Sequence, residues 1–150
     1  MQVYVEDERF LDMATAISGS GPAYVYLMLE SMVEAGVHMG FPRATAQKLV
    51  QHTMKGSVDY AIQRDDSDVH TLRNEITSPG GTTASALYHL EKGNFRTVVS
   101  DGVWAAYRRS LELGDQESNV GPGRSQTRKL PVFWQRDSKD DSDNLRDDSY

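Results

Sequence analysis

The sequence predicts an all-α fold for residues 1–114 of a 150-residue chain. In this region apolar residues recur about every three or four positions, which is the spacing of helices with one buried face. Glycine and proline separate these stretches, as expected where one helix ends and the next begins. No Asn-Gly or Asp-Gly turn joins two alternating runs, so the pattern of a β-hairpin is missing.

The first two predicted helices meet at a glycine-rich corner. A short segment begins at Asp12 and stops at residues 18–22, Ser-Gly-Ser-Gly-Pro, where two backbones are expected to approach closely. Pro22 suits the first turn of the second helix, because the N–H that it lacks would have no partner there. That helix extends to Gly40, a favourable residue just past a helix end. Its first half, residues 23–29, is apolar on every face, so a second chain is expected to cover it.

The third predicted helix opens at Phe41-Pro42 and carries one apolar stripe that is expected to face a core. The stripe consists of Ala46, Leu49, Val50, Thr53, Met54, Val58, Ala61 and Ile62. A polar turn follows at residues 64–68. Ser67 or Asp68 can then cap a short fourth helix, since both side chains accept hydrogen bonds from free N–H groups.

Two further helices complete the region. The first follows residues 77–83 and ends at Gly93-Asn94, and the second extends from Phe95 to Gly114. Gly102 lies inside the last helix and predicts a close approach of another helix.

Composition limits the classes of protein that this sequence can represent. A formal net charge of −6 argues against nucleic-acid binding, which needs clustered Lys and Arg. The absence of cysteine excludes disulfide scaffolds, thiolate zinc sites and a cysteine nucleophile. No apolar run reaches the roughly 18 residues of a membrane span, and residues 1–8 carry acids where a signal peptide is basic. We therefore expect a cytoplasmic protein that binds neither membranes nor nucleic acids.

Residues 115–150 differ from the rest of the chain and are expected to form a disordered polar and acidic tail. Gly121-Pro122-Gly123 is followed by a run rich in aspartate at residues 137–148, with too little apolar surface to offset the entropy of ordering. One apolar island, Leu130-Pro-Val-Phe-Trp134, interrupts this tail. The island is either an unstructured sticky stretch or a short docking motif.

Two patterns that often indicate cofactor or metal sites fail here. Residues 18–22 resemble a dinucleotide-binding fingerprint, but the third glycine, a preceding strand and the later acidic residue are missing. The four histidines, His38, His52, His70 and His89, lack the spacing of metal ligands, so no metal site is expected.

Residues 77–83, Thr-Ser-Pro-Gly-Gly-Thr-Thr, form the strongest candidate site. Two glycines expose backbone N–H groups directly before a helix, whose positive end also attracts anions. Hydroxyl groups surround these donors, so the loop suits a small carboxylate or phosphate. An ordinary loop with a threonine N-cap explains the same residues, and the spacing alone leaves both interpretations open.

Several motifs, in a fixed order, make the sequence resemble one known family. They are TAISGSGPAY at residues 15–24, EAGVHMGFPR at 34–43, LRNEITSPGGTT at 72–83 and RRSLELG at 108–114. Over residues 5–114 the chain resembles the C-terminal dimerisation domain of pyrroline-5-carboxylate reductase. Because both the order and the spacing of the motifs agree, the resemblance is specific.

The resemblance implies an oxidoreductase that reduces 1-pyrroline-5-carboxylate to L-proline with NADPH or NADH, in proline biosynthesis. Enzymes of this family have an N-terminal Rossmann domain and an all-α domain of the 6-phosphogluconate-dehydrogenase-like C-terminal type. Two such helical domains interlock into a homodimer, and dimers often assemble further into a decamer. The active site lies between the Rossmann domain of one subunit and the helical domain of its partner.

By position, the loop at residues 77–83 matches the substrate-binding loop of this family. The implied substrate-binding positions are Ser78, Gly80, Gly81, Thr83, Ile76 and Thr77. The first three would hold the substrate carboxylate, and the last two would line the pocket. Thr83, the implied catalytic residue, would hydrogen-bond the ring nitrogen and so orient the substrate and assist proton relay.

The Rossmann domain of the family would have to precede the matching region, and the sequence contains no counterpart of it. We therefore expect a truncated isoform or an incomplete gene product, which dimerises and binds substrate weakly without transferring hydride by itself. The alternative hypothesis is a non-catalytic dimerisation module that pairs with full-length reductase subunits and modulates their activity. A third hypothesis, an unrelated helical anion-binding protein, requires all the motifs to agree by coincidence.

Overall fold

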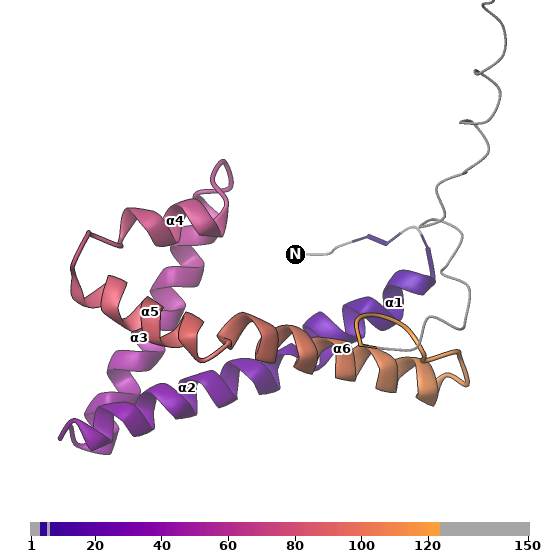
Figure 1. The fold of residues 1–150 in the computed structure, drawn as a ribbon, viewed down its shortest axis with the longest axis horizontal. Helices are drawn as coiled ribbons and strands as arrows, with labels where there is room; N and C mark the ends of the chain where they lie inside the picture. The colour runs from indigo at the N-terminus through magenta and orange to yellow at the C-terminus, as the bar shows by residue number, and fades with distance from the viewer. Residues whose placement is uncertain (1–3, 6, 124–150) are drawn as a thin grey trace, which may run out of the picture.

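The computed structural model describes residues 4–5 and 7–123, and the regular structure of this part of the chain consists of helices (Figure 1). In chain order these are α1 (Arg9–Ala14), the π-helical turn η1 (Thr15–Gly19), α2 (Gly21–His38), α3 (Arg43–Gln63), α4 (Val69–Glu75), α5 (Thr82–Lys92) and α6 (Phe95–Leu113). The all-α prediction is confirmed, since no strand occurs among the described residues.

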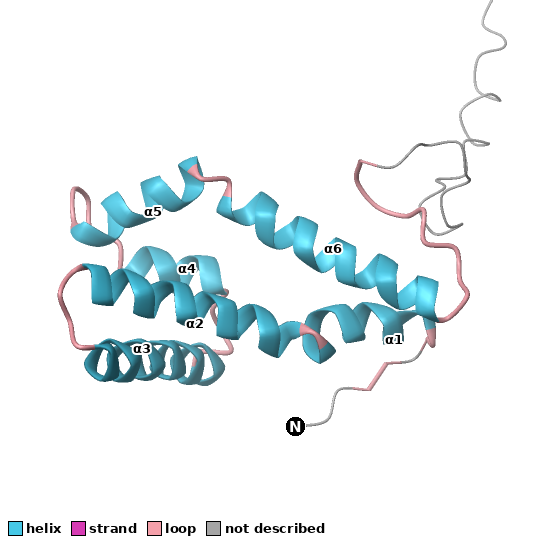
Figure 2. Ribbon diagram, turned by 90° about the horizontal axis from the view of Figure 1, so that it is seen from below, coloured by secondary structure: helices cyan, strands magenta, loops and turns pink. Residues whose placement is uncertain are grey.

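The glycine-rich corner is a π-helical turn between two helices that follow one another along one side of the molecule (Figure 2). The N–H of Ser20 donates to the carbonyl of Thr15 at 2.9 Å, which is the wider spacing of a π-helix. Pro22 lies in the first turn of α2, as predicted. The predicted close approach of backbones at this corner is wrong within this chain, because a Cβ on Gly21 would meet no atom within 4 Å.

Helix α2 ends where the sequence predicts. Gly40 has a φ of +107°, and the N–H of Phe41 donates to the carbonyl of Gly36 at 3.1 Å. These features are those of a Schellman motif, which satisfies the last carbonyls of a helix and favours glycine at the left-handed position. The chain then turns back into α3, which packs along the C-terminal half of α2.

A small core holds α2 and α3 together. Val33, Ala46 and Val50 are buried there, and Leu29, Met32, Val37 and Met54 pack around them. The closest approach is at Gly36, where a Cβ would lie 3.0 Å from the Cβ of Ala46. The close backbone contact that the sequence suggested for other glycines is therefore found at this one.

The apolar stripe of α3 is covered only in part. Ala46 and Val50 are buried, as predicted, but Leu49, Val58 and Ile62 are exposed, the last of them by 70%. The prediction that the whole stripe faces a core is therefore wrong for a single chain, because α2 covers only part of it.

The turn between α3 and α4 is fixed by side chains. Asp68 caps α4, accepting from the N–H of Thr71 at 2.9 Å, which confirms one of the two predicted caps. Arg64 donates to the hydroxyls of Tyr60 at 2.9 Å and Ser67 at 3.0 Å, and so connects the end of α3 to this turn.

Helix α6 returns along the molecule to the first helices, and it packs against η1 and α1 (Figure 1). Ala16 of η1 and Leu111 of α6 are both buried. The predicted close approach of a helix at Gly102 is wrong within this chain, because nothing lies within 4 Å of a Cβ at that position.

The predicted boundary at Gly114 coincides with the end of α6. Residues 115–123 of the predicted tail are described, and they contact α6, which the composition did not indicate. The rest of the tail, with the Leu130–Trp134 island, lies outside the described residues, so its disorder stays a prediction.

Candidate functional site

The candidate site is the loop between α4 and α5, at the end of the molecule remote from α1 (Figure 1). The N–H of Gly81 donates to the carbonyl of Ser78 at 3.1 Å and closes a tight turn. Gly80 occupies the third position of this turn with a φ of +70°, and Pro79 precedes it. This is the residue order of a type II turn, in which the third position requires a left-handed backbone. Local turn chemistry therefore determines the shape of the loop.

Gly81 fits the loop for a different reason. A Cβ at this position would lie 2.6 Å from the hydroxyl oxygen of Ser78 and 3.2 Å from its carbonyl oxygen. The backbone of Gly81 and the side chain of Ser78 are therefore in close contact, and a larger residue at position 81 would displace the Ser78 hydroxyl. The sequence predicts both residues as parts of one binding loop, and the structure brings them together.

Helix α5 begins at Thr82 with Gly81 as its N-cap, and no side chain caps it. The threonine N-cap of the alternative interpretation is therefore wrong. The first N–H groups of a helix have no partner within the helix, and the helix dipole adds partial positive charge there. The first turn of α5 also lacks an acidic side chain, so this helix end is suited to an external anion.

The hydroxyl groups of the loop divide into two kinds. Thr77 donates to the carbonyl of Arg73 at 2.7 Å, so its hydroxyl stabilises the end of α4. No described residue forms a hydrogen bond with the hydroxyls of Ser78 or Thr83, which remain available to a ligand. Ile76 is 71% exposed and Thr83 is half-buried, so the loop presents one apolar side chain beside its polar groups.

Arg73 is a residue near the loop that sequence reasoning missed. Its Nε atom is buried, and no described residue accepts a hydrogen bond from it, while Nη2 donates to the side chain of Asn74 at 3.1 Å. A basic residue one helical turn before the loop was the available signal.

No residue between positions 76 and 83 has an ionisable side chain. The nearest perturbed group towards the N-terminus is Asp68, whose pKa is lowered chiefly by the hydrogen bond that it accepts from the N–H of Thr71. The loop can thus bind and orient an anion, whereas a reaction that transfers a proton would require a group from elsewhere.

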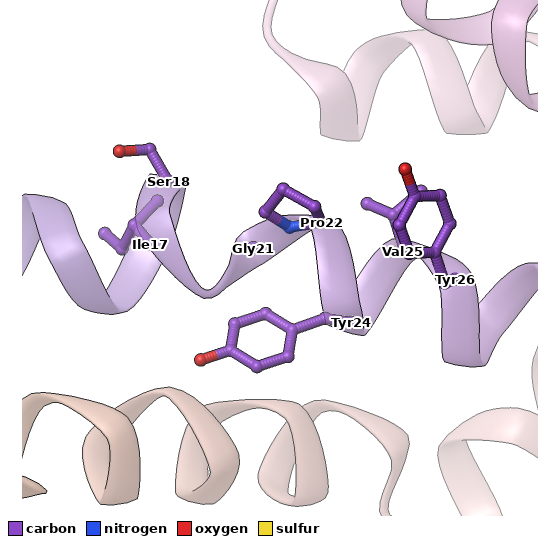
Figure 3. A pocket seen from close by; sticks show the side chains of 7 residues that line it. All are labelled: Ile17, Ser18, Gly21, Pro22, Tyr24, Val25 and Tyr26. Carbon is purple, nitrogen blue, oxygen red and sulfur yellow. The ribbon is translucent and has the colours of Figure 1, made fainter.

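A separate hollow of about 420 Å³ lies on the surface where η1 meets α2 (Figure 3). Ile17, Pro22 and Val25 contribute apolar atoms to it, and Tyr24 and Tyr26 lie on different sides of the helix. The Tyr24 hydroxyl donates to the carbonyl of Ala16 at 3.0 Å. None of the lining residues belongs to the loop, so the predicted site residues and this hollow are different features.

The described residues contain no cluster of three or more His, Cys, Asp or Glu side chains able to hold a metal ion. Nor does this part of the chain include a helix long and apolar enough to cross a membrane.

Comparison with known proteins gives a consistent result. Residues 8–113 match the family model for pyrroline-5-carboxylate reductase dimerisation. The pyrroline-5-carboxylate reductase of Synechocystis is 46% identical over 107 residues, covering 71% of this chain and 40% of the relative. That of Pisum sativum is 41% identical over 114 residues, covering 75% of this chain and 41% of the relative.

Two solved structures share the fold. The Plasmodium falciparum pyrroline carboxylate reductase, crystallised with NADP bound, superposes with a TM-score of 0.69 at 47% identity, covering 72% of this chain and 41% of that one. The reductase of Coxiella burnetii gives a TM-score of 0.71 at 38% identity, covering 74% and 41%. The chain spans about two fifths of the length of these relatives.

Proposed function

Because the chain belongs to the pyrroline-5-carboxylate reductase dimerisation family, we propose that it is the dimerising and substrate-binding half of such a reductase. The proposed reaction is the reduction of 1-pyrroline-5-carboxylate to L-proline. The observation that carries the proposal is the loop at residues 77–83, which places a tight glycine turn against a helix end without a side-chain cap. This arrangement suits the carboxylate of the substrate.

The substrate carboxylate would bind at the Ser78 hydroxyl and the Gly80 N–H, beside the backbone of Gly81. The Gly81 N–H itself donates to the carbonyl of Ser78 and holds the turn, so the first turn of α5 supplies the remaining donors. Thr83, in that first turn, would hydrogen-bond the ring nitrogen, and its role is to orient the imine because a threonine hydroxyl does not ionise near neutral pH. The exposed Ile76 and the adjoining Thr77 would form the wall of the pocket.

NADPH or NADH, the cofactors of the proposed reaction, do not fit the described residues. A dinucleotide site of the Rossmann type requires a βαβ unit, and this part of the chain contains no strand. The described residues would therefore bind and orient substrate, while the reductant would bind to a domain of the Rossmann type outside them. This division supports a shared active site, which one helical domain cannot complete.

The first half of α2 supports self-association. Val25, Tyr26 and Leu27 are exposed on this helix, the last by 65%, although most of their side-chain surface is apolar. Such a surface is stable in water when another chain covers it. We propose a homodimer built on this face, capable of further assembly into a decamer. We also propose that the protein is cytoplasmic, since a chain without cysteine gains nothing from an oxidising compartment.

A second candidate function follows from the partial coverage of the relatives, about two fifths of their length. A helical domain that associates through α2 could pair with full-length subunits and lower their activity, since each mixed dimer would lack one cofactor domain. Co-purification with a full-length reductase favours this function, whereas a pure homodimer in cells that contain both chains contradicts it.

The test is NADPH oxidation by the purified chain after addition of 1-pyrroline-5-carboxylate. We expect no turnover by the chain alone, and turnover when the chain is joined to the NAD(P)H-binding domain of a relative. In that joined protein Thr83→Ala should lower kcat by about 10²-fold, whereas Ser85→Ala on the same helix should not. Turnover by the chain alone would contradict the shared site, and an unchanged Thr83→Ala rate would remove Thr83 from the mechanism.

A further inference from the structure

A short segment beyond the family match packs against the last helix. The match ends at residue 113, and residues 115–123, here called the C-terminal strap, turn back beside α6. The strap starts with Asp115 in the left-handed region, at a φ of +54°, and the N–H of Gln116 donates to the carbonyl of Leu111 at 2.8 Å. These two features reverse the chain directly after α6.

Two side chains of α6 hold the far end of the strap. Arg108 donates from Nε to the carbonyl of Val120 at 2.9 Å and from Nη2 to the carbonyl of Pro122 at 3.0 Å. The same guanidinium lies 5.6 Å from the ring centroid of Trp104, at the distance of a cation–π contact. Its planar fork thus meets two carbonyls of one turn and an aromatic face at once.

Gly121 lies against the indole of Trp104. A Cβ on Gly121 would be 2.5–2.9 Å from three atoms of that ring, so no larger residue fits. Its φ of +82° is also one that glycine adopts without strain. Steric fit and backbone conformation therefore select glycine independently. Two independent requirements at one position indicate a specific contact between the strap and α6.

The near end of the strap reaches α1. Asp12 accepts from the Ser110 hydroxyl of α6 at 2.5 Å and from the Gln116 side chain of the strap at 3.1 Å. Tyr107 lies on α6, and its pKa is raised chiefly by burial and then by the charge of Asp12. One carboxylate thus joins the first helix, the last helix and the strap.

We propose that Trp104 and Arg108 form a binding site for a Gly-Pro-Gly turn of the same chain, and that the docked strap is a latch that holds α1 on α6. Helix α1 continues into η1 and packs on α6, and the Asp12 carboxylate links it to both α6 and the strap by hydrogen bonds. The strap supplies the Gln116 donor to that carboxylate, while Arg108 and Trp104 fix the far end of the strap. The latch therefore opposes the separation of α1 from α6.

The docking step can be tested through the fluorescence of Trp104. The sequence contains two tryptophans, so a Trp134→Phe background leaves Trp104 as the reporter. In this background Gly121→Ala and Arg108→Ala should each increase acrylamide quenching at least twofold and shift the emission to longer wavelength. Gly123→Ala is the matched control, because Gly123 has a similar φ of +75° but nothing within 4 Å of a Cβ.

The latch step can be tested by hydrogen exchange of the α1 amides in the same variants. Exchange should become several-fold faster when the strap is released, and Gln116→Ala should accelerate it while leaving Trp104 quenching nearly unchanged. Arg96→Ala, which removes an exposed ion pair with Glu91 at the other end of α6, should change neither measurement. Unchanged quenching in Gly121→Ala would overturn the docking site, and faster quenching with unchanged α1 exchange would overturn the latch. Gly121 lies outside the helices, so the helical circular dichroism of this variant checks that the fold is retained.

Discussion

The two halves of α2 differ in how much of their apolar surface this chain buries. The C-terminal half packs on α3, where Val33 and Gly36 are buried against Ala46 and Val50. The N-terminal half is just as apolar, yet Leu27 and its neighbours remain exposed. The difference shows that hydrophobicity alone does not define a core, since one half of the same helix is buried within this chain while the other half, where we propose that a second chain packs, stays exposed.

The candidate site, like the N-terminal half of α2, is not buried by the rest of this chain. Helix α5, which carries Thr83, contains no buried residue. The loop nevertheless has a defined shape, because the Ser78–Gly81 turn is closed by its own hydrogen bond. The site is thus organised locally and left open to whatever surface completes it.

The largest expected effect is on the N-terminal half of α2. Leu27→Asp should leave the monomer folded, because Leu27 is 65% exposed, but it should weaken dimerisation by about 4 kcal/mol, or roughly a thousandfold, since an unpaired charge would be buried. Sedimentation equilibrium measures the dissociation constant, and circular dichroism checks the helices. Gln51→Asp, on an exposed position of α3, is the control. Equal association of Leu27→Asp and the unmodified chain would show that another face forms the dimer.

A smaller effect is expected in the C-terminal half. Gly36→Val should lower the free energy of unfolding by about 2 kcal/mol, because a Cβ there already lies 3.0 Å from the Cβ of Ala46 and would force α2 and α3 apart. Urea denaturation measures the loss. Gly56→Val is the matched control, since Gly56 is also helical but has open space around it. Similar stability of the two variants would mean that α2 and α3 separate without cost.

The loop should respond to backbone strain rather than to packing. Gly80→Ala should cost about 1 kcal/mol, because its φ of +70° is unfavourable for a residue with a Cβ, although no atom lies within 4 Å of that position. Gly80→Asn should cost less, since asparagine tolerates the left-handed region. Thermal unfolding compares the two variants, and an Asn variant that is no more stable than the Ala variant would argue against strain as the cause.

The smallest effect concerns the cap of α4. The pKa of Asp68 is lowered from its ordinary value of 3.8, chiefly by the hydrogen bond from the Thr71 N–H. The charged carboxylate therefore stabilises the folded state above pH 3.8, and this contribution is lost as the pH falls through the lowered pKa. The hydrogen exchange of the α4 amides, followed as a function of pH, measures this stabilisation by the Asp68 carboxylate. Asp68→Asn keeps the cap without titrating, so its exchange should lack this acid step; the same step in both would assign it to another group.

Much of the fold could be predicted because its signals are local. Helix ends at Pro22, Gly40 and Asp68 depend on neighbouring backbone groups, so the residues that determine them are also neighbours in the sequence. The same is true of the Ser78–Gly81 turn. The expectations that fail at Gly102 and at the outer part of the α3 stripe concern contacts between segments distant in the sequence, whereas the threonine N-cap of α5 fails within a single turn.

Local chemistry thus decides where the helices of this protein begin and end, and it shapes the loop that is the candidate site. The tertiary arrangement decides that Gly36 is the glycine of close approach, that Asp12 joins both ends of the helical region, and that Gly121 lies on Trp104. The physical reason is the range of the interactions. Hydrogen bonds over a few residues determine a turn or a cap, whereas burial depends on which segments, distant in the sequence, pack together and exclude water.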